Sequence, residues 1–187
     1  MKRIFIAIKV EPEKTLLDLI SSLRSGMEKD NIKWTNTANV HITLAFLGDT
    51  DESIIKSIIE MLKEVCTGLT PFQLRMKGTG VFRNFSDPRI IWTGIEQSDR
   101  LLQLNKIILT GLSKLNIDTG DKPFNPHLTL GRIKHLNDKN VFKGIIEKFQ
   151  NTDIQNIPVN EVVLYESILL PKGPVYTPLG TMPMLKR

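Results

Sequence analysis

The chain has 187 residues, of which 41% are apolar and 24% charged, and its formal net charge is +5. This is the composition of an ordinary globular protein, and its single cysteine excludes an internal disulfide and a cysteine-based metal site. No apolar run approaches the roughly 18 residues of a membrane helix, and the N-terminal apolar stretch is too short for a signal peptide. We therefore expect a cytoplasmic protein with no membrane association.

Short apolar strands and amphipathic helices alternate along the chain. Strands are short runs rich in Ile, Val and Phe bounded by turn residues, and they are predicted at residues 3–10, 34–48, 71–82, 89–95, 126–133, 159–170 and 173–185. Helices show apolar residues three and four apart, and they are predicted at residues 16–27, 54–62, 98–115 and 141–149. Because strand and helix recur in both halves, we predict an α+β protein with two similar lobes, in which residues 1–187 form a single bilobal domain.

Two of the three histidines stand in the same four-residue pattern. "VHITLAFLG" places His41 two residues before Thr43, and "PHLTLGR" repeats His-x-Thr-Leu 86 residues later with His127 and Thr129. Strand side chains alternate between faces, so each strand presents an imidazole beside a hydroxyl on one face and large apolar groups on the other. One such pattern alone is usually structural, but two among three histidines indicate a functional pair. We expect His135 to be an ordinary surface histidine.

The same alternation predicts what surrounds each pattern. Ala45 and Gly131 share the face of the histidines, where their small size would leave room for a ligand. Arg132 has the opposite parity, but it lies near the strand end, where its forked donors could bend toward a phosphate. The aromatic residues that we expect in the core are Phe5, Trp34 and Phe46.

Two imidazoles and two hydroxyls suit in-line displacement at phosphorus. The attacking and leaving oxygens lie on opposite sides of the phosphorus, so one group must accept a proton and another must donate one. Histidine does either near neutral pH, because its unperturbed pKa is about 6.5. A metal site would need more ligands than two histidines, and neither motif contains an acidic residue. A serine-hydrolase site would need a G-x-S-x-G turn, which the sequence lacks. We expect no metal and no cofactor.

At these residues the sequence resembles the 2H phosphoesterase superfamily, which is defined by two His-x-Thr/Ser motifs. Within it, the chain is most similar to the RNA 2',3'-cyclic phosphodiesterases, also called 2'-5' RNA ligases. The resemblance covers nearly the whole chain through "RIFIAI", "VHITLAFLGDT", "DPRIIWTGI", "FNPHLTLGR" and "VVLYESILLPKGPVYTPL". Gly131 stands where alanine is usual in the family. The resemblance implies two pseudo-symmetric lobes whose antiparallel sheets face a central cleft, with the helices outside.

The resemblance also implies the activity and the roles of the site residues. It implies metal-independent opening of a 2',3'-cyclic phosphate at an RNA end to a 2'-phosphomonoester, by a protein that we expect to be a monomer. His41 would be the proton donor to the leaving 3' oxygen, and His127 the proton acceptor that activates water. Thr43 and Thr129 would hold the phosphate, and Arg132 matches the arginine of the second motif. The pseudo-symmetry leaves the two histidine roles interchangeable on the sequence alone.

Other substrates and one other class of function stay open. A 2H enzyme could act on a 2'-5' linked oligonucleotide or an ADP-ribose cyclic phosphate, or could ligate RNA ends. Ligation would be poorly driven without a nucleotide cofactor, and no G-x-x-x-x-G-K-[ST] loop is present to bind one. A non-catalytic RNA-end-binding module would be better served by arginine or lysine, which stay charged. The candidates for stacking a terminal base, with packing as the alternative for each, are Phe82, Phe85, Trp92 and Tyr176.

Overall fold

The structure, a computed structural model, describes residues 1–120, 123–171 and 173–185. The strands are β1 (Lys2–Lys9), β2 (Asn31–Trp34), β3 (His41–Thr50), β4 (Phe72–Phe82), β5 (Ile90–Ile95), β6 (His127–His135), β7 (Asp153–Val159), β8 (Glu161–Leu170) and β9 (Gly173–Pro183). The α-helices are α1 (Lys14–Gly26), α2 (Glu52–Thr67), α3 (Asp99–Lys114) and α4 (Lys139–Lys148). A short 3-10 helix (Thr37–Asn39) precedes β3. Among the described residues, none of the helices is long and apolar enough to cross a membrane.

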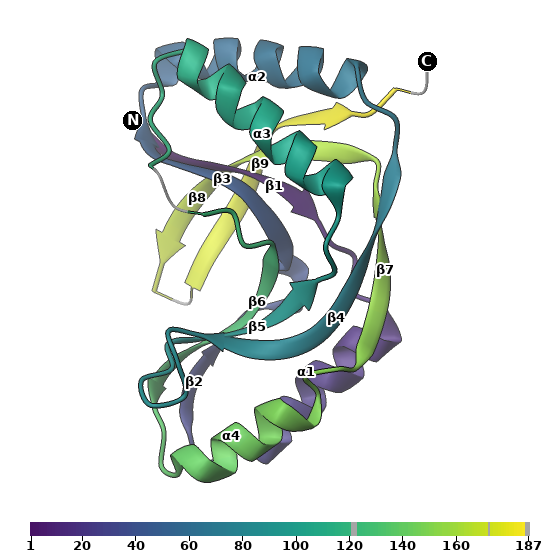
Figure 1. The fold of residues 1–187 in the computed structure, drawn as a ribbon. Coiled ribbons are helices and arrows are strands. Elements are labelled where there is room, and N and C mark those ends of the chain that lie inside the picture. Colours follow the sequence, from purple (N-terminus) through teal and green to yellow (C-terminus); the bar gives the residue numbers. More distant parts are fainter. Residues whose placement is uncertain (121–122, 172, 186–187) are drawn as a thin grey trace.

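The strands form one curled antiparallel sheet in the order β7-β4-β5-β6-β3-β1-β8-β9, and β2 pairs with β6 (Figure 1). The sheet has two four-stranded halves, β9-β8-β1-β3 and β6-β5-β4-β7, which meet where β3 and β6 pair at Ile42 and Leu128. The two histidine strands are therefore the innermost strands of the two halves. This arrangement confirms the predicted bilobal α+β fold.

The helices cover the outer face of the sheet in two pairs at opposite ends of the molecule (Figure 1). Helices α2 and α3 pack on each other and on β3, β8 and β9, while α1 and α4 pack on each other and on β7 and β4. Helix α1 follows β1 of the first half but covers the second half, and α3 follows β5 of the second half but covers the first. Because the halves exchange helices in this way, neither half is a contiguous piece of the chain.

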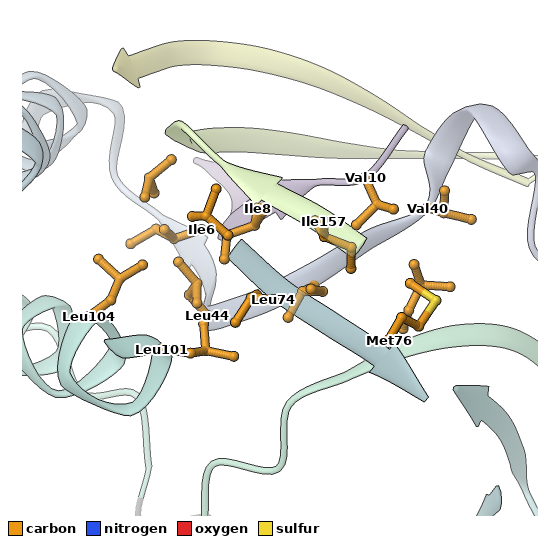
Figure 2. Packing of buried hydrophobic residues seen from close by; sticks show 14 of the residues in the cluster. Ile6, Ile8, Val10, Val40, Leu44, Leu74, Met76, Leu101, Leu104 and Ile157 are labelled. Carbon is orange, nitrogen blue, oxygen red and sulfur yellow. The ribbon is translucent and has the colours of Figure 1, made fainter. Parts of the chain in front are cut away.

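Buried apolar side chains from both halves join in one hydrophobic cluster. Figure 2 shows Ile6 and Leu44 of the first half beside Leu74 of β4 and Ile157 of β7, with Leu101 of α3 covering them. Burial of such side chains stabilises a fold by about 25 cal/mol for each Å² of apolar surface removed from water. The continuous core therefore holds the two histidine strands in a fixed relation to each other.

Two strands were not predicted as the structure has them. Strand β2 is a separate edge segment, and the 3-10 helix divides it from β3, where the sequence pattern predicted one strand over residues 34–48. Strand β7 was missed entirely, since Asn156 and Pro158 interrupt its apolar pattern. Proline is tolerated there because β7 lies at the edge of the sheet, where its missing N–H leaves no ladder bond unmade.

Candidate active site

A register shift follows the first His-x-Thr motif on β3. Thr43 and Ala45 pair with consecutive residues of β1, so Leu44 has no partner on that strand. An extra residue of this kind reverses the alternation of side chains along the strand. Ala45 therefore points into the core with 6% of its surface exposed, whereas Phe46 is 63% exposed. The predictions that Ala45 would leave room beside the histidine and that Phe46 would be buried are wrong, because the bulge exchanges their faces.

Strand β6 carries the same bulge at the same place in its motif. Thr129 and Gly131 pair with consecutive residues of β5, and Leu130 is passed over. Arg132 is therefore exposed on the face that carries His127 and Thr129. The arginine needs no bend around the strand end to reach that face, because the bulge places it there.

Gly131 is buried by β2 and does not open the histidine face. A Cβ added at this position would lie 2.9 Å from Cγ2 of Ile32 and 3.1 Å from Cε3 of Trp34. The prediction that Gly131 leaves room for a ligand is therefore wrong, since its small size lets β2 pack closely on β6. Trp34 is half-buried and packs against the core, in agreement with its prediction.

The two motifs meet at the seam between the halves of the sheet. Ile42 lies opposite Leu128 in antiparallel pairing, so each histidine stands across from the threonine of the other motif. Both histidines and both threonines are half-buried. The structure thus brings the four predicted motif residues together on one face of the sheet, with Arg132 exposed on that same face.

Both imidazoles are held in the same orientation. Nδ1 of His41 lies 2.7 Å from the carbonyl oxygen of Asn39, and Nδ1 of His127 lies 2.7 Å from that of Asn125. A carbonyl oxygen only accepts, so Nδ1 carries the hydrogen in both rings. Nε2 of each ring is therefore left to take up or release a proton at the face of the site. The sequence held a signal for these partners that we missed, because Asn-x-His occurs in both motifs.

Burial lowers the pKa of both histidines below the usual value. For His41, desolvation is the main cause, the hydrogen bond to Asn39 opposes it, and the positive charge of His127 lowers the pKa further. For His127, desolvation is again the main cause, the bond to Asn125 opposes it, and the charge of Arg132 lowers the pKa further. Both imidazoles are thereby biased toward the neutral form in the free protein.

Two aromatic rings that contact each other also pack on His41. The ring centroid of Phe5 lies 5.0 Å away and that of Tyr176 lies 5.2 Å away, the latter edge-on. Phe5 is buried as predicted, with 3% of its surface exposed, and its ring also packs against His41. Tyr176, a predicted stacking candidate, belongs to the site.

The aromatic neighbours of His127 are fewer. Phe82 meets it edge-on at 4.5 Å, and Trp92 lies 5.7 Å beyond Phe82. Phe85 packs instead on Phe142 of α4, with centroids 6.5 Å apart, and adjoins the core. Of the four stacking candidates, Phe82 and Tyr176 therefore touch a motif histidine, and Phe85 packs away from both.

Other reactive groups lie apart from this face. Cys66 is buried on α2, and burial raises the pKa of its thiol to about 11, so it carries no thiolate near neutral pH. Within residues 1–120, 123–171 and 173–185, no group of three or more His, Cys, Asp or Glu is placed to hold a metal ion.

Comparison with known proteins agrees with this site. The chain is 36% identical to an RNA 2',3'-cyclic phosphodiesterase of Thermotoga maritima over 93% of its own length and 91% of the relative. It is 35% identical to a protein of the same name from Archaeoglobus fulgidus over 95% of its length and 97% of the relative. The crystal structure of TT0787 of Thermus thermophilus superposes with a TM-score of 0.81 at 27% identity, covering 97% of each chain.

These likenesses confirm the enzyme class predicted from the sequence, a phosphoric diester hydrolase. Residues 9–168, which contain both histidine motifs and Arg132, match the sequence pattern of a single family. The chain therefore belongs to the 2'-5' RNA ligase superfamily, the 2H phosphoesterases.

Proposed function

We propose that this protein hydrolyses a 2',3'-cyclic phosphate at the end of an RNA to a 2'-phosphomonoester, with His41 and His127 as a metal-independent acid–base pair. The observation that carries the proposal is the matched pair of imidazoles, each with Nδ1 hydrogen-bonded to a backbone carbonyl, so that proton exchange falls to Nε2. The names of the relatives supply the substrate, since several of them are RNA 2',3'-cyclic phosphodiesterases.

The reaction needs one proton acceptor and one proton donor on opposite sides of the phosphorus. Nε2 of His127 takes a proton from water while the water oxygen forms a bond to phosphorus. The bond between phosphorus and the 3' oxygen breaks, and that oxygen takes a proton from Nε2 of His41. The products are a 2'-phosphomonoester and a free 3' hydroxyl, and the proton gained by His127 returns to His41 through solvent.

The remaining motif residues suit the non-bridging phosphate oxygens. The hydroxyls of Thr43 and Thr129 stand on the same face as the imidazoles and can donate to those oxygens. Arg132 emerges beside them and offers a charged, forked pair of donors. These groups would neutralise charge that builds up as the water oxygen attacks.

Arg132 also distinguishes the two histidines. Burial is the main cause of the lowered pKa of His127, and the charge of Arg132 lowers that pKa further, which favours the neutral imidazole that accepts a proton. His41 must enter the reaction protonated, and the negative phosphate beside it would raise its pKa when the substrate binds. This difference supports His127 as the base and His41 as the acid.

The test is to incubate the protein with a short RNA that ends in a 2',3'-cyclic phosphate, in the presence of EDTA, and to identify the product end. We expect a 2'-phosphate from the wild type, and its formation should be about 10²–10⁴-fold slower in His41→Ala or His127→Ala. A 3'-phosphate would reverse the assignment of the leaving oxygen. RNA that binds the wild type without turnover would overturn the proposal in favour of an RNA-end-binding module.

A further inference from the structure

Lys33 of β2 lies directly opposite Arg132 of β6 in their antiparallel pairing. Residues in such a pair point to the same face of the sheet, with Cβ atoms about 4.5–5.5 Å apart. Ile32 and Trp34 pack on the core, so Lys33 between them faces the other way, beside Arg132. Both side chains are exposed. The face of the site therefore carries two adjacent cations, of which the proposed reaction uses only Arg132.

This pair of cations is unfavourable by itself, because like charges directly opposite each other destabilise a sheet. Within the part of the chain that the structure describes, no carboxylate forms an ion pair with either residue. The one acidic residue in β2, β6 and the loop of residues 83–89 is Asp87, which pairs with Arg83 and Arg89 of the same loop. An anionic ligand between Lys33 and Arg132 would remove their repulsion.

The position of Lys33 beside the site follows from the pairing of β6. Strand β5 pairs with one edge of β6, whereas β2 and β3 follow each other along its other edge. Lys33 therefore lies on the side of Arg132 that leads through the 3-10 helix to His41. In the proposed reaction His41 protonates the leaving 3' oxygen, so the terminal ribose lies on this side too.

The electrostatic influence of Arg132 agrees with a position between the base and β9. Burial is the main influence on the pKa values of His127 and Tyr176, lowering the first and raising the second. The charge of Arg132 lowers both pKa values. Arg132 is thus close to the reacting phosphate, and Lys33 is the next cation outward from it.

An RNA end offers a second anion at this place. The terminal ribose alone separates the cyclic phosphate from the phosphodiester at its 5' oxygen, so the two phosphates are near neighbours. Lysine carries a point charge on a flexible stem, and it binds phosphates without the fixed geometry of arginine. A free nucleoside 2',3'-cyclic phosphate lacks this second phosphate.

We infer that Lys33 binds the phosphodiester that joins the terminal nucleotide to the rest of the RNA, while Arg132 binds the cyclic phosphate. This inference rests on the proposed function. It makes Lys33 a specificity residue, through which the enzyme favours the end of an RNA chain over a free nucleoside cyclic phosphate.

The experiment compares two diuridine dinucleotides that end in a 2',3'-cyclic phosphate and differ only in the linkage between the nucleosides. One has the natural phosphodiester, and the other has a methylphosphonate, which has nearly the same size but no charge. The wild type should favour the phosphodiester by about fivefold to tenfold in kcat/KM, a modest effect for a charged contact because Lys33 is exposed. Lys33→Gln should bring the ratio of the two kcat/KM values near unity, and Lys33→Arg should restore most of it.

Lys63→Gln is the matched control. It removes the same charge from an exposed position on α2, at the opposite end of the molecule from β2 (Figure 1). It should keep the wild-type preference for the phosphodiester. An equal loss of preference in Lys63→Gln would assign the effect to the net charge of the protein and overturn the inference.

The remaining outcomes separate this inference from the proposed function. If Lys33→Gln slowed both dinucleotides equally, Lys33 would act at the cyclic phosphate and the inference would be wrong. If it changed neither, Lys33 would only be a charge that protects the exposed edge of β2. In both cases an active wild type would leave the proposed function intact. A wild type that turned over neither dinucleotide would overturn the proposed function together with the inference.

Discussion

Strands β3 and β6 share a histidine–carbonyl hydrogen bond and a bulge, but the side chains around these features differ. On each, a histidine donates Nδ1–H to the carbonyl two residues earlier, and a bulge follows at the leucine directly after the threonine. After the bulge, Phe46 stands on β3 where Arg132 stands on β6. The rings of Phe5 and Tyr176 pack on His41, whereas the charge of Arg132 stands near His127.

This difference shows how a nearly symmetric pair can serve as acid and base. Two identical side chains take different roles only when their environments separate their pKa values or their access to the reacting atoms. Here the common backbone holds Nδ1 of both rings in the same way, and the residue after the bulge supplies charge on one side only. Substitutions can remove either a feature that the two strands share or one that distinguishes them.

The largest effect is expected from the shared feature itself. His41→Ala and His127→Ala should each lower kcat by about 10²–10⁴-fold, because each removes one positioned proton-transfer group. His135→Ala is the matched control, since that residue is exposed at the end of β6 and outside both motifs, and it should keep the wild-type rate. Steady-state rates on a nucleoside 2',3'-cyclic phosphate measure all three. A motif variant that retains most of its rate would show that the two imidazoles do not act as a pair.

The distinguishing residue should have the next largest effect. Arg132→Gln removes a charged donor to the phosphate and should lower kcat/KM by about 10–100-fold, in line with hydrogen bonds to charged groups. The charge of Arg132 lowers the pKa of His127, so its removal raises that pKa, and the base becomes neutral only at higher pH. The acidic limb of the kcat/KM profile should therefore move to higher pH.

The counterpart on β3 is the control for this shift. Phe46→Leu changes the exposed residue after the first bulge without changing any charge. Its pH profile should follow the wild type on both limbs. An equal shift in the two variants would mean that Arg132 acts through packing at the seam and not through its charge.

Much of the site was predictable because it depends on local periodicity. Alternation along a strand placed each threonine on the face of its histidine, and the structure agrees. The faces of Ala45, Phe46 and Gly131 were not predictable, because the bulges are stabilised by distant groups. The carbonyl of Leu44 accepts from the side chain of Asn105, and that of Leu130 accepts from the main-chain N–H of Thr35, directly after β2. Nothing in the residues next to the motifs encodes these donors.

The donors of the two bulges differ in a way that stability measurements can use. Nδ2 of Asn105 lies 2.7 Å from the carbonyl of Leu44, while the main-chain N–H of Thr35 lies 2.8 Å from that of Leu130. Asn105→Ala leaves a buried carbonyl without a partner and should lower the free energy of unfolding by about 1–3 kcal/mol. Thr35→Ala retains its main-chain N–H and should change the free energy little. Denaturant unfolding of both variants checks this, and equal losses would show that Asn105 does not support the bulge.

The smallest effect is expected where the two strands differ by one methyl group. Gly131 and Ala45 follow their bulges at equivalent places, but only the glycine lies under β2. Gly131→Ala would bring a Cβ to 2.9 Å from Cγ2 of Ile32, and that half-buried side chain must move by a few tenths of an ångström. We expect a loss of about 1 kcal/mol in the free energy of unfolding, at the low end of the cost of overpacking.

A second substitution, at Ile32 of β2, tests whether contact with β2 causes the loss of stability in Gly131→Ala. Ile32→Val shortens the other branch of the side chain and gives it room to turn, so part of the loss in Gly131→Ala should be recovered in the double variant. A double-mutant cycle in denaturant measures the coupling between the two positions. Hydrolysis rates should stay near the wild type throughout, because Gly131 faces the core. If Gly131→Ala instead slowed the reaction without changing stability, residue 131 would lie at the substrate. Regular alternation along β6, without the bulge at Leu130, would have put it there.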